Sequence, residues 1–96
     1  MSIYEQLKAK RDAILEVATK HGAYNIRIFG SVARGEARSE SDVDFLVNLQ
    51  PDRSLLDHAA LLLELEALMG CKVDVVNERG LKARIRDRVL QEAIPL

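Results

Sequence analysis

Apolar residues along the chain recur with two different spacings, and the spacing changes where glycine or proline interrupts it. Near the start they recur at helical intervals, in a stripe made by Ile3, Leu7, Ile14 and Ala18. This spacing predicts one face of an amphipathic helix. Ser2 followed three residues later by Glu5 is typical of a capping box, so the pattern predicts one helix from Ser2 up to Gly22.

Three shorter segments have the composition of strands. They are rich in β-branched residues, and they cover residues 24–29 (YNIRIF), 43–48 (VDFLVN) and 72–77 (KVDVVN). In the first of them, apolar and polar positions alternate as they do in a strand with one buried face. The second is apolar enough to lie in the centre of a sheet. Pro51 ends the second segment.

Two further helices are predicted in the second half of the chain. Ser54 can cap a helix that runs to Met69 and stops at Gly70, and a last helix is predicted from Leu81 to Ala93. A helix of about four turns therefore joins the second strand to the third, which makes a βαβ unit with parallel neighbouring strands. The expected fold class is α/β, in the broad sense that includes α+β, with a small mixed β-sheet.

Length and composition narrow the picture. The 96 residues suit a single domain spanning 1–96 with one core. A hydrophobic content of 48% and a net charge of −1 indicate a soluble globular protein and argue against a generic polyanion binder. No apolar run approaches the roughly 20 residues of a membrane span, so we expect a cytoplasmic protein with no membrane partner. Cys71 is the single cysteine, which argues against a disulfide framework.

Candidate chemistry is concentrated in residues 30–44, GSVARGEARSESDVD. Gly30 and Ser31 directly follow a predicted strand, where backbone N–H groups and a hydroxyl suit a phosphate. Most Gly-Ser turns are only turns, so this signal is weak by itself. Asp42 and Asp44 are two residues apart at the start of a strand, which places both carboxylates on one face.

Two carboxylates this close are unfavourable unless a cation lies between them. Their hard oxygen ligands favour Mg²⁺, which also accepts phosphate oxygens and water as ligands. The alternative interpretation is that Asp42 caps a turn and Asp44 faces solvent. Asp74 favours the metal site, because parallel pairing of the second and third strands would bring it beside Asp44. The alternative for Asp74 is an edge-strand charge that discourages aggregation.

A cluster of Asp42, Asp44 and Asp74 around one or two metal ions is what phosphoryl or nucleotidyl transfer requires. Paired metal ions stabilise the attacking and the leaving oxygen, and a third carboxylate can take the proton of the incoming hydroxyl. From the residues alone, the sequence therefore predicts a reaction class and leaves the acceptor open.

The motif resembles a known family. It consists of Gly30-Ser31, Arg34-Gly35, Ser41-Asp42-Val43-Asp44 and then Asp74. This order is similar to the nucleotidyltransferase fold of the DNA polymerase β superfamily, and more closely to the minimal nucleotidyltransferases called MNT domains. The resemblance covers essentially the whole chain. It implies that Gly30, Ser31 and Arg34 bind the triphosphate of ATP.

The same resemblance implies roles for the carboxylates and for the protein. Asp42 and Asp44 would bind two Mg²⁺ ions, and Asp74 would complete the metal site and activate the acceptor hydroxyl. MNT domains are the antitoxins of HEPN/MNT toxin–antitoxin pairs. The implied reaction is transfer of AMP from ATP to a tyrosine hydroxyl of the HEPN ribonuclease toxin, in a heteromeric complex. The alternative is a non-catalytic antitoxin that neutralises its toxin by binding alone.

Other polar residues receive plainer interpretations. Five cations lie between residues 79 and 88, where a solvated rim is expected and contact with an acidic partner or RNA is the alternative. The segment lacks aromatic residues for base stacking, so nucleic acid is an unlikely partner. Arg38 lies in the same loop as Arg34 and could reach a phosphate. Neither His21 nor His58 belongs to a cluster of candidate metal ligands in the sequence.

The helix of residues 54–69 is apolar around most of its circumference. Leu61, Leu65 and Leu68 share one edge of it. Either this helix is covered by its own sheet and neighbouring helices, which is the expectation, or part of it meets a partner protein.

Overall fold

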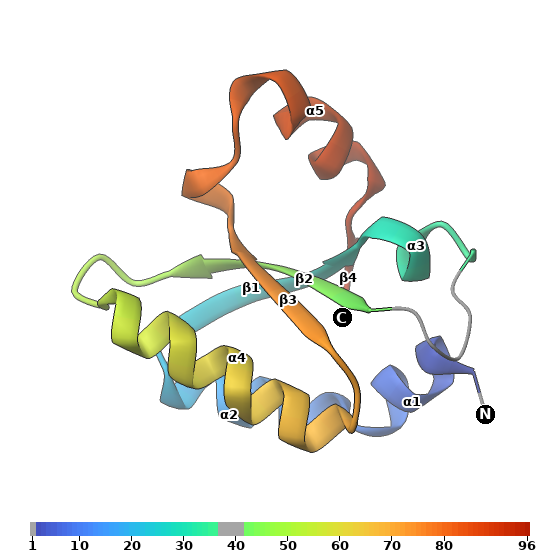
Figure 1. Cartoon of the computed structure of the whole chain (residues 1–96), viewed down its shortest axis with the longest axis horizontal. Helices are drawn as coiled ribbons and strands as arrows, with labels where there is room; N and C mark the ends of the chain where they lie inside the picture. Colours follow the sequence, from blue (N-terminus) through green and yellow to red (C-terminus); the bar gives the residue numbers. More distant parts are fainter. Residues whose placement is uncertain (1, 37–41) are drawn as a thin grey trace.

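A mixed β-sheet runs through the middle of the molecule in the computed structural model, which describes residues 2–36 and 42–96 (Figure 1). Within these residues the sheet has four strands, β1 (Ala23–Phe29), β2 (Val43–Leu49), β3 (Val73–Asn77) and β4 (Ile94–Pro95). The strand order is β3-β2-β1-β4. β2 and β3 are parallel, and β1 is antiparallel to both β2 and β4. The predicted mixed sheet and its parallel pair are confirmed.

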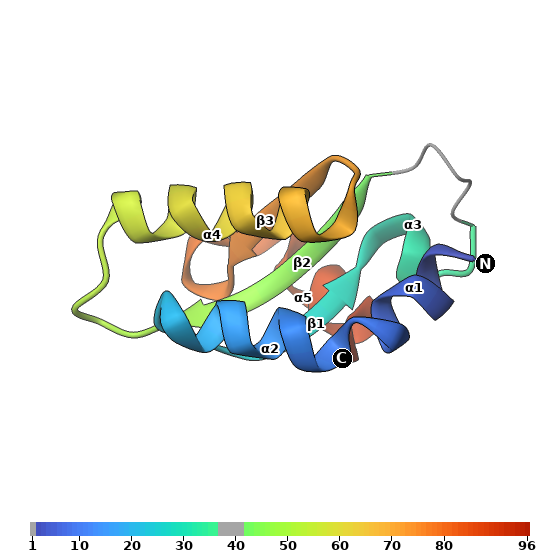
Figure 2. The same ribbon diagram turned by 90° about the horizontal axis from the view of Figure 1, so that it is seen from below.

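One face of the sheet is covered by the helices α1 (Ile3–Ala9), α2 (Arg11–Lys20) and α4 (Leu55–Met69), of which α2 and α4 run side by side in Figure 2. Because side chains alternate along a strand, Val43, Phe45 and Val47 of β2 all point to this face. All three are fully buried. The core therefore lies between the sheet and these helices, and its largest buried members include Leu7, Ile14, Ile28, Leu61 and Leu65.

The helix α4 begins and ends at the residues that the sequence predicts. The Ser54 hydroxyl accepts the Leu56 N–H at 3.2 Å, and the Asp57 carboxylate accepts the Ser54 N–H at 3.0 Å, which closes a capping box. Gly70 ends the helix in the left-handed conformation at φ 69°. One stripe of α4 is core, while Leu55, Leu56 and Leu63 are 81%, 81% and 63% exposed. Burial of Leu61 and Leu65 confirms the core interpretation of their edge.

The prediction of one helix from Ser2 to Gly22 is wrong, because the helical segment divides at Lys10 into α1 and α2. Lys10 has φ −102° and ψ 10°, and its ammonium donates to the Leu68 carbonyl at 2.8 Å, near the end of α4. Between Leu7 and Ile14 the only apolar residues are alanines, so no large apolar side chain holds this stretch straight. Leu7 of α1 and Ile14 of α2 are both completely buried, so both helices contribute to the core.

Smaller differences appear around the candidate site. The loop expected after β1 begins with one helical turn, α3 (Gly30–Ala33), and a 3₁₀ turn, η1 (Glu78–Gly80), follows β3. The last helix, α5 (Ala83–Glu92), is shorter than predicted and is followed by β4. A strand of two residues is too short to show alternation, which is why its sequence gives no strand signal.

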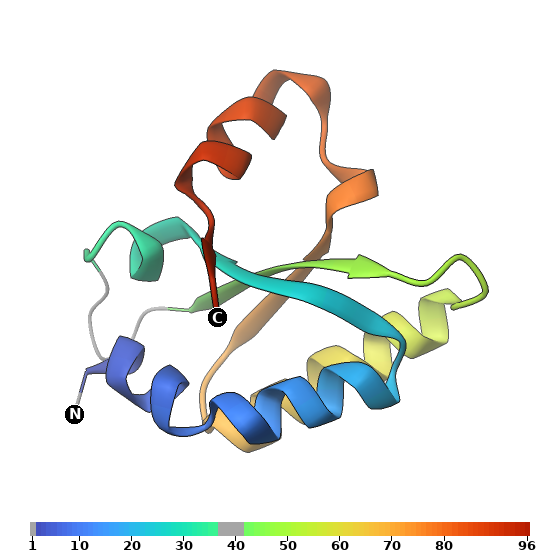
Figure 3. The same cartoon turned by 180° about the vertical axis from the view of Figure 1, so that it is seen from behind.

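The segment η1–α5 arches over the sheet face opposite α2 and α4 (Figure 3). Val89 is the residue of α5 that is buried, and Leu46 of β2 is fully buried on the same side of the sheet. In the described parts of the chain, no helix is long and apolar enough to span a membrane. The two sheet faces therefore have different covers, a continuous helical layer and an arch.

Candidate active site

The strand register places the predicted carboxylates next to each other. Asp44 of β2 lies directly opposite Asp74 of β3, and Phe29 at the end of β1 lies opposite Asp44 from the other side. Gly30 follows Phe29 and opens α3. Because Val43 and Phe45 point into the core, Asp44 points to the face under α5, and the same alternation puts Asp74 there. Three adjacent strands thus deliver the candidate residues to one face.

Gly30 lies in direct contact with Asp44, and this contact explains why a glycine follows β1. Its φ of +74° is in the left-handed region that favours glycine. A Cβ atom at this position would collide with Oδ2 of Asp44. The backbone at the start of α3 can therefore lie against the candidate metal ligand only because residue 30 has no side chain.

The carboxylates repel one another in this structure. Asp44 is partly buried, and burial raises its pKa above the ordinary value of 3.8. The negative charges of Asp74, Asp42 and Glu92 raise this pKa further, while Arg34 opposes them. Asp42, just before β2, and Asp74 are both exposed. The face under α5 is thus a region of unfavourable negative charge that a cation would relieve.

The donors on this face are carboxylate oxygens, which suit Mg²⁺. Among residues 2–36 and 42–96, no group of three or more acidic, histidine or cysteine side chains is arranged to hold a metal ion. The assignment of Asp42, Asp44 and Asp74 as a metal site stays a prediction, with Asp44 and Asp74 paired by register.

Gly30 and Arg34 meet an acidic residue that the sequence interpretation does not include. Glu92, the last residue of α5, accepts the Gly30 N–H at 2.7 Å through Oε2 and the Arg34 Nη1 at 2.8 Å through Oε1. Arg34 also donates from Nε to Glu36 at 3.1 Å. Hydrogen bonds from Glu92 and Glu36 raise the pKa of Arg34. A single acidic residue at a helix end carries no sequence signal for such a contact.

Comparison with known proteins identifies the family of this chain. A model of the nucleotidyltransferase domain family matches residues 10–96. The chain belongs to the nucleotidyltransferase domain family. The predicted resemblance to nucleotidyltransferases is confirmed, and so is the prediction that the protein is an enzyme.

Curated relatives cover most of this nucleotidyltransferase. The protein adenylyltransferase MntA of Thermococcus cleftensis is 43% identical over 79 residues, which are 82% of this chain and 80% of that protein. A protein of Methanocaldococcus jannaschii with a provisional name as a protein adenylyltransferase is 41% identical over 81 residues, or 84% of this chain and 87% of that one.

Solved structures share the fold of the nucleotidyltransferase. One, described provisionally as a minimal nucleotidyltransferase, is 56% identical with a TM-score of 0.88 and covers 100% of this chain and 97% of its own. The crystal structure of a toxin–antitoxin with AMP-PNP has a TM-score of 0.75 at 20% identity, covering 88% of this chain and 69% of that one. At this identity the second likeness shows the fold alone.

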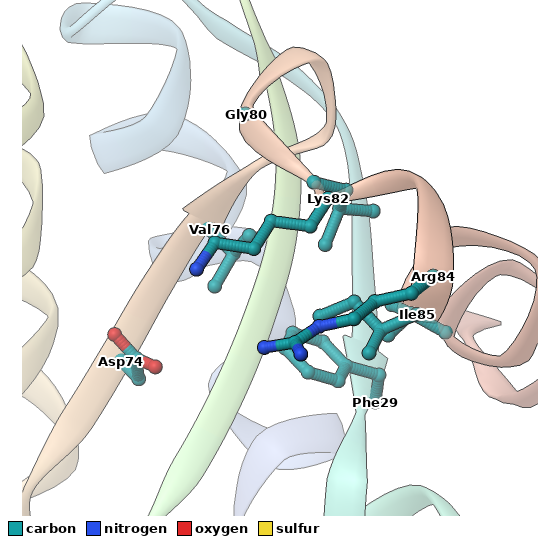
Figure 4. A pocket seen from close by; sticks show the side chains of 9 residues that line it. Phe29, Asp74, Val76, Gly80, Lys82, Arg84 and Ile85 are labelled. Atoms are coloured by element: carbon teal, nitrogen blue, oxygen red, sulfur yellow. The ribbon is translucent and has the colours of Figure 1, made fainter.

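A cavity of about 370 Å³ lies beside Asp74, between the sheet and the η1–α5 arch. Its walls are largely apolar, and its lining includes Phe29, Val76, Ile85 and Val89. Figure 4 shows the side chains of Lys82 and Arg84 extending from the arch toward the face that carries Asp74. These two cations were expected to belong to a solvated rim. They are exposed, as predicted, but they also line the cavity.

The two histidines of this nucleotidyltransferase contact other residues of the fold. His58 Nε2 lies 2.7 Å from the Val75 carbonyl oxygen and links α4 to β3, whereas His21 Nε2 lies 3.1 Å from Glu64 Oε1. Each histidine thus makes a contact within the fold, and the interpretation that neither belongs to a metal site stays a prediction. Arg38 and Ser41 lie outside the residues that the structure describes.

Proposed function

We propose that this nucleotidyltransferase transfers AMP from ATP to a tyrosine hydroxyl of a partner HEPN ribonuclease toxin and thereby acts as an antitoxin. The observation that carries the proposed chemistry is the pairing of Asp44 with Asp74 beside Gly30. The names of the curated relatives, protein adenylyltransferases, support the reaction. The fold shared with toxin–antitoxin structures, one with AMP-PNP, supports the partner and the nucleotide.

Each predicted residue has a role in this proposal. Asp42, Asp44 and Asp74 would hold two Mg²⁺ ions, which would supply positive charge to the phosphates of ATP and to the reacting phosphorus. Gly30 and Ser31 place the start of α3 beside the terminal phosphates, and Arg34 contributes a cationic hydrogen-bond donor to them. The residues proposed to contact the phosphates follow β1, and Asp74 lies on β3, two strands away from β1 in the sheet.

The proposed transfer step needs only the acceptor hydroxyl, ATP and a group that takes the hydroxyl proton. The acceptor hydroxyl oxygen attacks the α-phosphorus, the bond from that phosphorus to the bridging β-oxygen breaks, and pyrophosphate leaves. Asp74 takes the hydroxyl proton, because it lies at the end of the carboxylate row farthest from the phosphate contacts. The cavity beside Asp74 gives room on this side for a ring-bearing group, and its apolar walls suit such a group.

Label transfer tests the reaction class. The full chain is incubated in a lysate of its source cell with Mg²⁺ and ATP labelled at either the α or the γ phosphate. We expect label from the α position only, on a protein band, and loss of that label with Asp44→Asn. Asp52→Asn is the matched control, because its side chain is 81% exposed and lies beyond the other end of β2 from Asp44. Label from the γ position would instead indicate a kinase.

The role of Asp74 has its own kinetic test. With Asp74→Asn, we expect a single-turnover transfer rate at least about a hundredfold lower, within the usual range for a general base. Nucleotide affinity, measured by titration, should change much less. The reverse pattern, intact chemistry with weakened nucleotide binding, would contradict the proton-acceptor role.

The non-catalytic alternative is separated by the same variants. If binding alone neutralises the toxin, Asp44→Asn will still protect cells that express the toxin. The proposal expects protection to be lost in Asp44→Asn while the two proteins still co-purify.

A further inference from the structure

Glu92 lies opposite Gly30 as a consequence of the strand register. In the antiparallel pairing of β1 with β4, Ile28 lies opposite Ile94. Two residues further along β1 is Gly30, and two residues back from Ile94 is Glu92, so the register continues to this pair. Glu92 is the last residue of the helix α5 and not part of the strand β4. The Gly30 N–H is accepted by the Glu92 side-chain carboxylate at 2.7 Å, in place of a backbone carbonyl. The fold therefore fixes this contact.

The carboxylate of Glu92 uses both of its oxygens. Oε2 accepts the Gly30 N–H, and Oε1 accepts Arg34 Nη1 at 2.8 Å. The side chain is only 16% exposed. Burial raises the pKa of Glu92, but the bonds from Arg34 and Gly30 outweigh this effect and hold the pKa below its ordinary value. One ionised group thus holds two of the three residues expected to bind the triphosphate.

The bond to Gly30 also reaches Asp44. Gly30 is in contact with the Asp44 carboxylate, so close that a Cβ atom would collide with it. Fixing the Gly30 backbone from the Glu92 side therefore limits the space in which the Asp44 carboxylate can turn. Glu92 at the end of α5 thus contacts Gly30, and Gly30 in turn contacts the candidate metal ligand Asp44.

We propose that Glu92 is a positioning residue for nucleotidyl transfer, which fixes the Gly30 backbone and the Arg34 guanidinium in the orientation that receives the triphosphate. The inference rests on the proposed nucleotide site. Glu92 itself touches neither nucleotide nor acceptor in this role. Arg34 has five N–H donors, and its bonds to Glu92 and Glu36 use two of them, so donors remain for a phosphate.

Glu92 is held too firmly to be a plug that the nucleotide displaces. The backbone after it pairs with β1, and the Leu96 N–H donates to the Ile26 carbonyl at 3.1 Å. On its other side the Ala93 N–H donates to the Val89 carbonyl at 2.9 Å. Removing the carboxylate from Gly30 would require a change in these backbone contacts as well.

The two contacts can be separated by substitution. Glu92→Gln keeps one oxygen for the Gly30 N–H and loses the charge pair with Arg34, whereas Glu92→Ala loses both contacts. Glu36→Gln removes the other carboxylate on Arg34, is more exposed, and serves as the matched control. Circular dichroism and thermal melting are recorded for every variant to show that it is folded.

Nucleotide affinity is the first readout, measured by calorimetric titration with AMP-PNP and Mg²⁺. We expect Glu92→Ala to bind the nucleotide about tenfold more weakly, because an Arg34 that is no longer held in place would lose about one charge-assisted hydrogen bond to the triphosphate. Glu92→Gln should lie between Glu92→Ala and the wild type, and Glu36→Gln should change affinity by less than about twofold. In transfer assays, the loss should appear in KM for ATP at least as strongly as in kcat.

The Gly30 amide gives a second readout that needs neither nucleotide nor activity. A proton donated to a carboxylate resonates downfield, so the Gly30 amide signal should move upfield in Glu92→Ala and stay nearer to its wild-type position in Glu92→Gln. A merely structural role for Glu92 would lower the melting temperature without changing nucleotide affinity in the folded variant.

The outcomes distinguish this inference from the proposed function. A wild-type protein that binds AMP-PNP but transfers no AMP would contradict the function and leave the affinity comparison as the test of Glu92. Wild-type affinity in Glu92→Ala would overturn the inference. Tighter binding by Glu92→Ala would also overturn it, because the carboxylate would then compete with the triphosphate. If Glu92→Ala does not fold, Glu92→Gln carries the same test against Glu36→Gln.

Discussion

The two faces of the sheet differ most clearly at two adjacent residues of β2. Phe45 is completely buried between the sheet and the helices α2 and α4, while Asp44 points to the opposite face and is only partly buried. The first face consists of apolar side chains under a continuous helical layer. The second carries carboxylates, cations and a cavity under an arch. Alternation along one strand thus separates stability from chemistry.

The difference follows from what covers each face. The helix α4 has fifteen residues, is capped at both ends and buries a full apolar stripe. The helix α5 has ten residues and buries Val89. Water reaches the second face, so carboxylates there keep much of their hydration and cost less than they would in the core. A protein of this size can hold a negatively charged site because its stability comes mainly from the other face.

Truncating the core face should have the largest effect on folding. Phe45→Ala removes a fully buried aromatic ring and should lower the free energy of unfolding by about 3–5 kcal/mol. Chemical denaturation measures this loss. Activity per folded molecule should change little, because the ring points away from the site. A loss below about 1 kcal/mol would mean that this face does not carry the stability.

A methyl group at the junction of the two faces should have a mixed effect. Gly30→Ala forces a side chain into the left-handed region, which costs roughly 1–2 kcal/mol, and the methyl group would also displace the Asp44 carboxylate. We expect a modest loss of stability with a much larger loss of AMP transfer. Gly35→Ala is the control, because it has the same positive φ but open space around its Cβ position. Equal activity in both variants would refute the contact with Asp44.

The open face should show its charge repulsion as a dependence of stability on pH. Because the pKa of Asp44 is raised in the folded protein, its ionised form disfavours folding above that pKa. In the presence of a metal chelator, the Asp44→Asn variant should therefore be slightly more stable than the wild type at pH 7. The difference should shrink as pH falls through the raised pKa and vanish below the ordinary value of 3.8. A constant difference across this range would contradict the assignment.

The outer surface of α4 should be the least sensitive. Leu63 is 63% exposed, so Leu63→Ser should change the free energy of unfolding by no more than about 0.5 kcal/mol. Leu65→Ser, two residues along and almost fully buried, is the contrasting variant and should destabilise strongly. Similar losses in both would show that the exposed leucines are covered by another molecule in solution.

Much of the fold can be predicted because its signals are local. The capping box of Ser54 and the stop at Gly70 define α4, and a helix of this length between two apolar strands predicts their parallel pairing. The break at Lys10 could not be predicted, because no glycine or proline marks it, and the contact that Lys10 makes with the Leu68 carbonyl joins residues far apart in the sequence. The strand β4 is likewise held by its partner β1 and not by its own composition.

The candidate site divides in the same way. Asp44 and Asp74 could be placed side by side from the sequence, because parallel pairing and alternation are regular. Glu92 could not be placed beside Gly30 from the sequence, because their contact follows from the pairing of β1 with β4, and β4 was not predicted. The cavity beside Asp74 could not be predicted either, because its walls come from β1, β3 and α5, whose relative positions depend on tertiary packing.

The contact between Glu92 and Gly30 joins two positions that are far apart in the order of synthesis. In a growing chain, Gly30 is made 62 residues before Glu92, whose carboxylate holds the loop that begins at Gly30. The helical layer and the core strands can assemble before α5 and β4 exist, yet the loop is then untethered. A chain cut before the segment of α5 and β4 would reproduce that state, because the core strands β1, β2 and β3 lie before the cut and Glu92 lies after it. The presence of this segment, and not the fold alone, would then decide when the enzyme is competent.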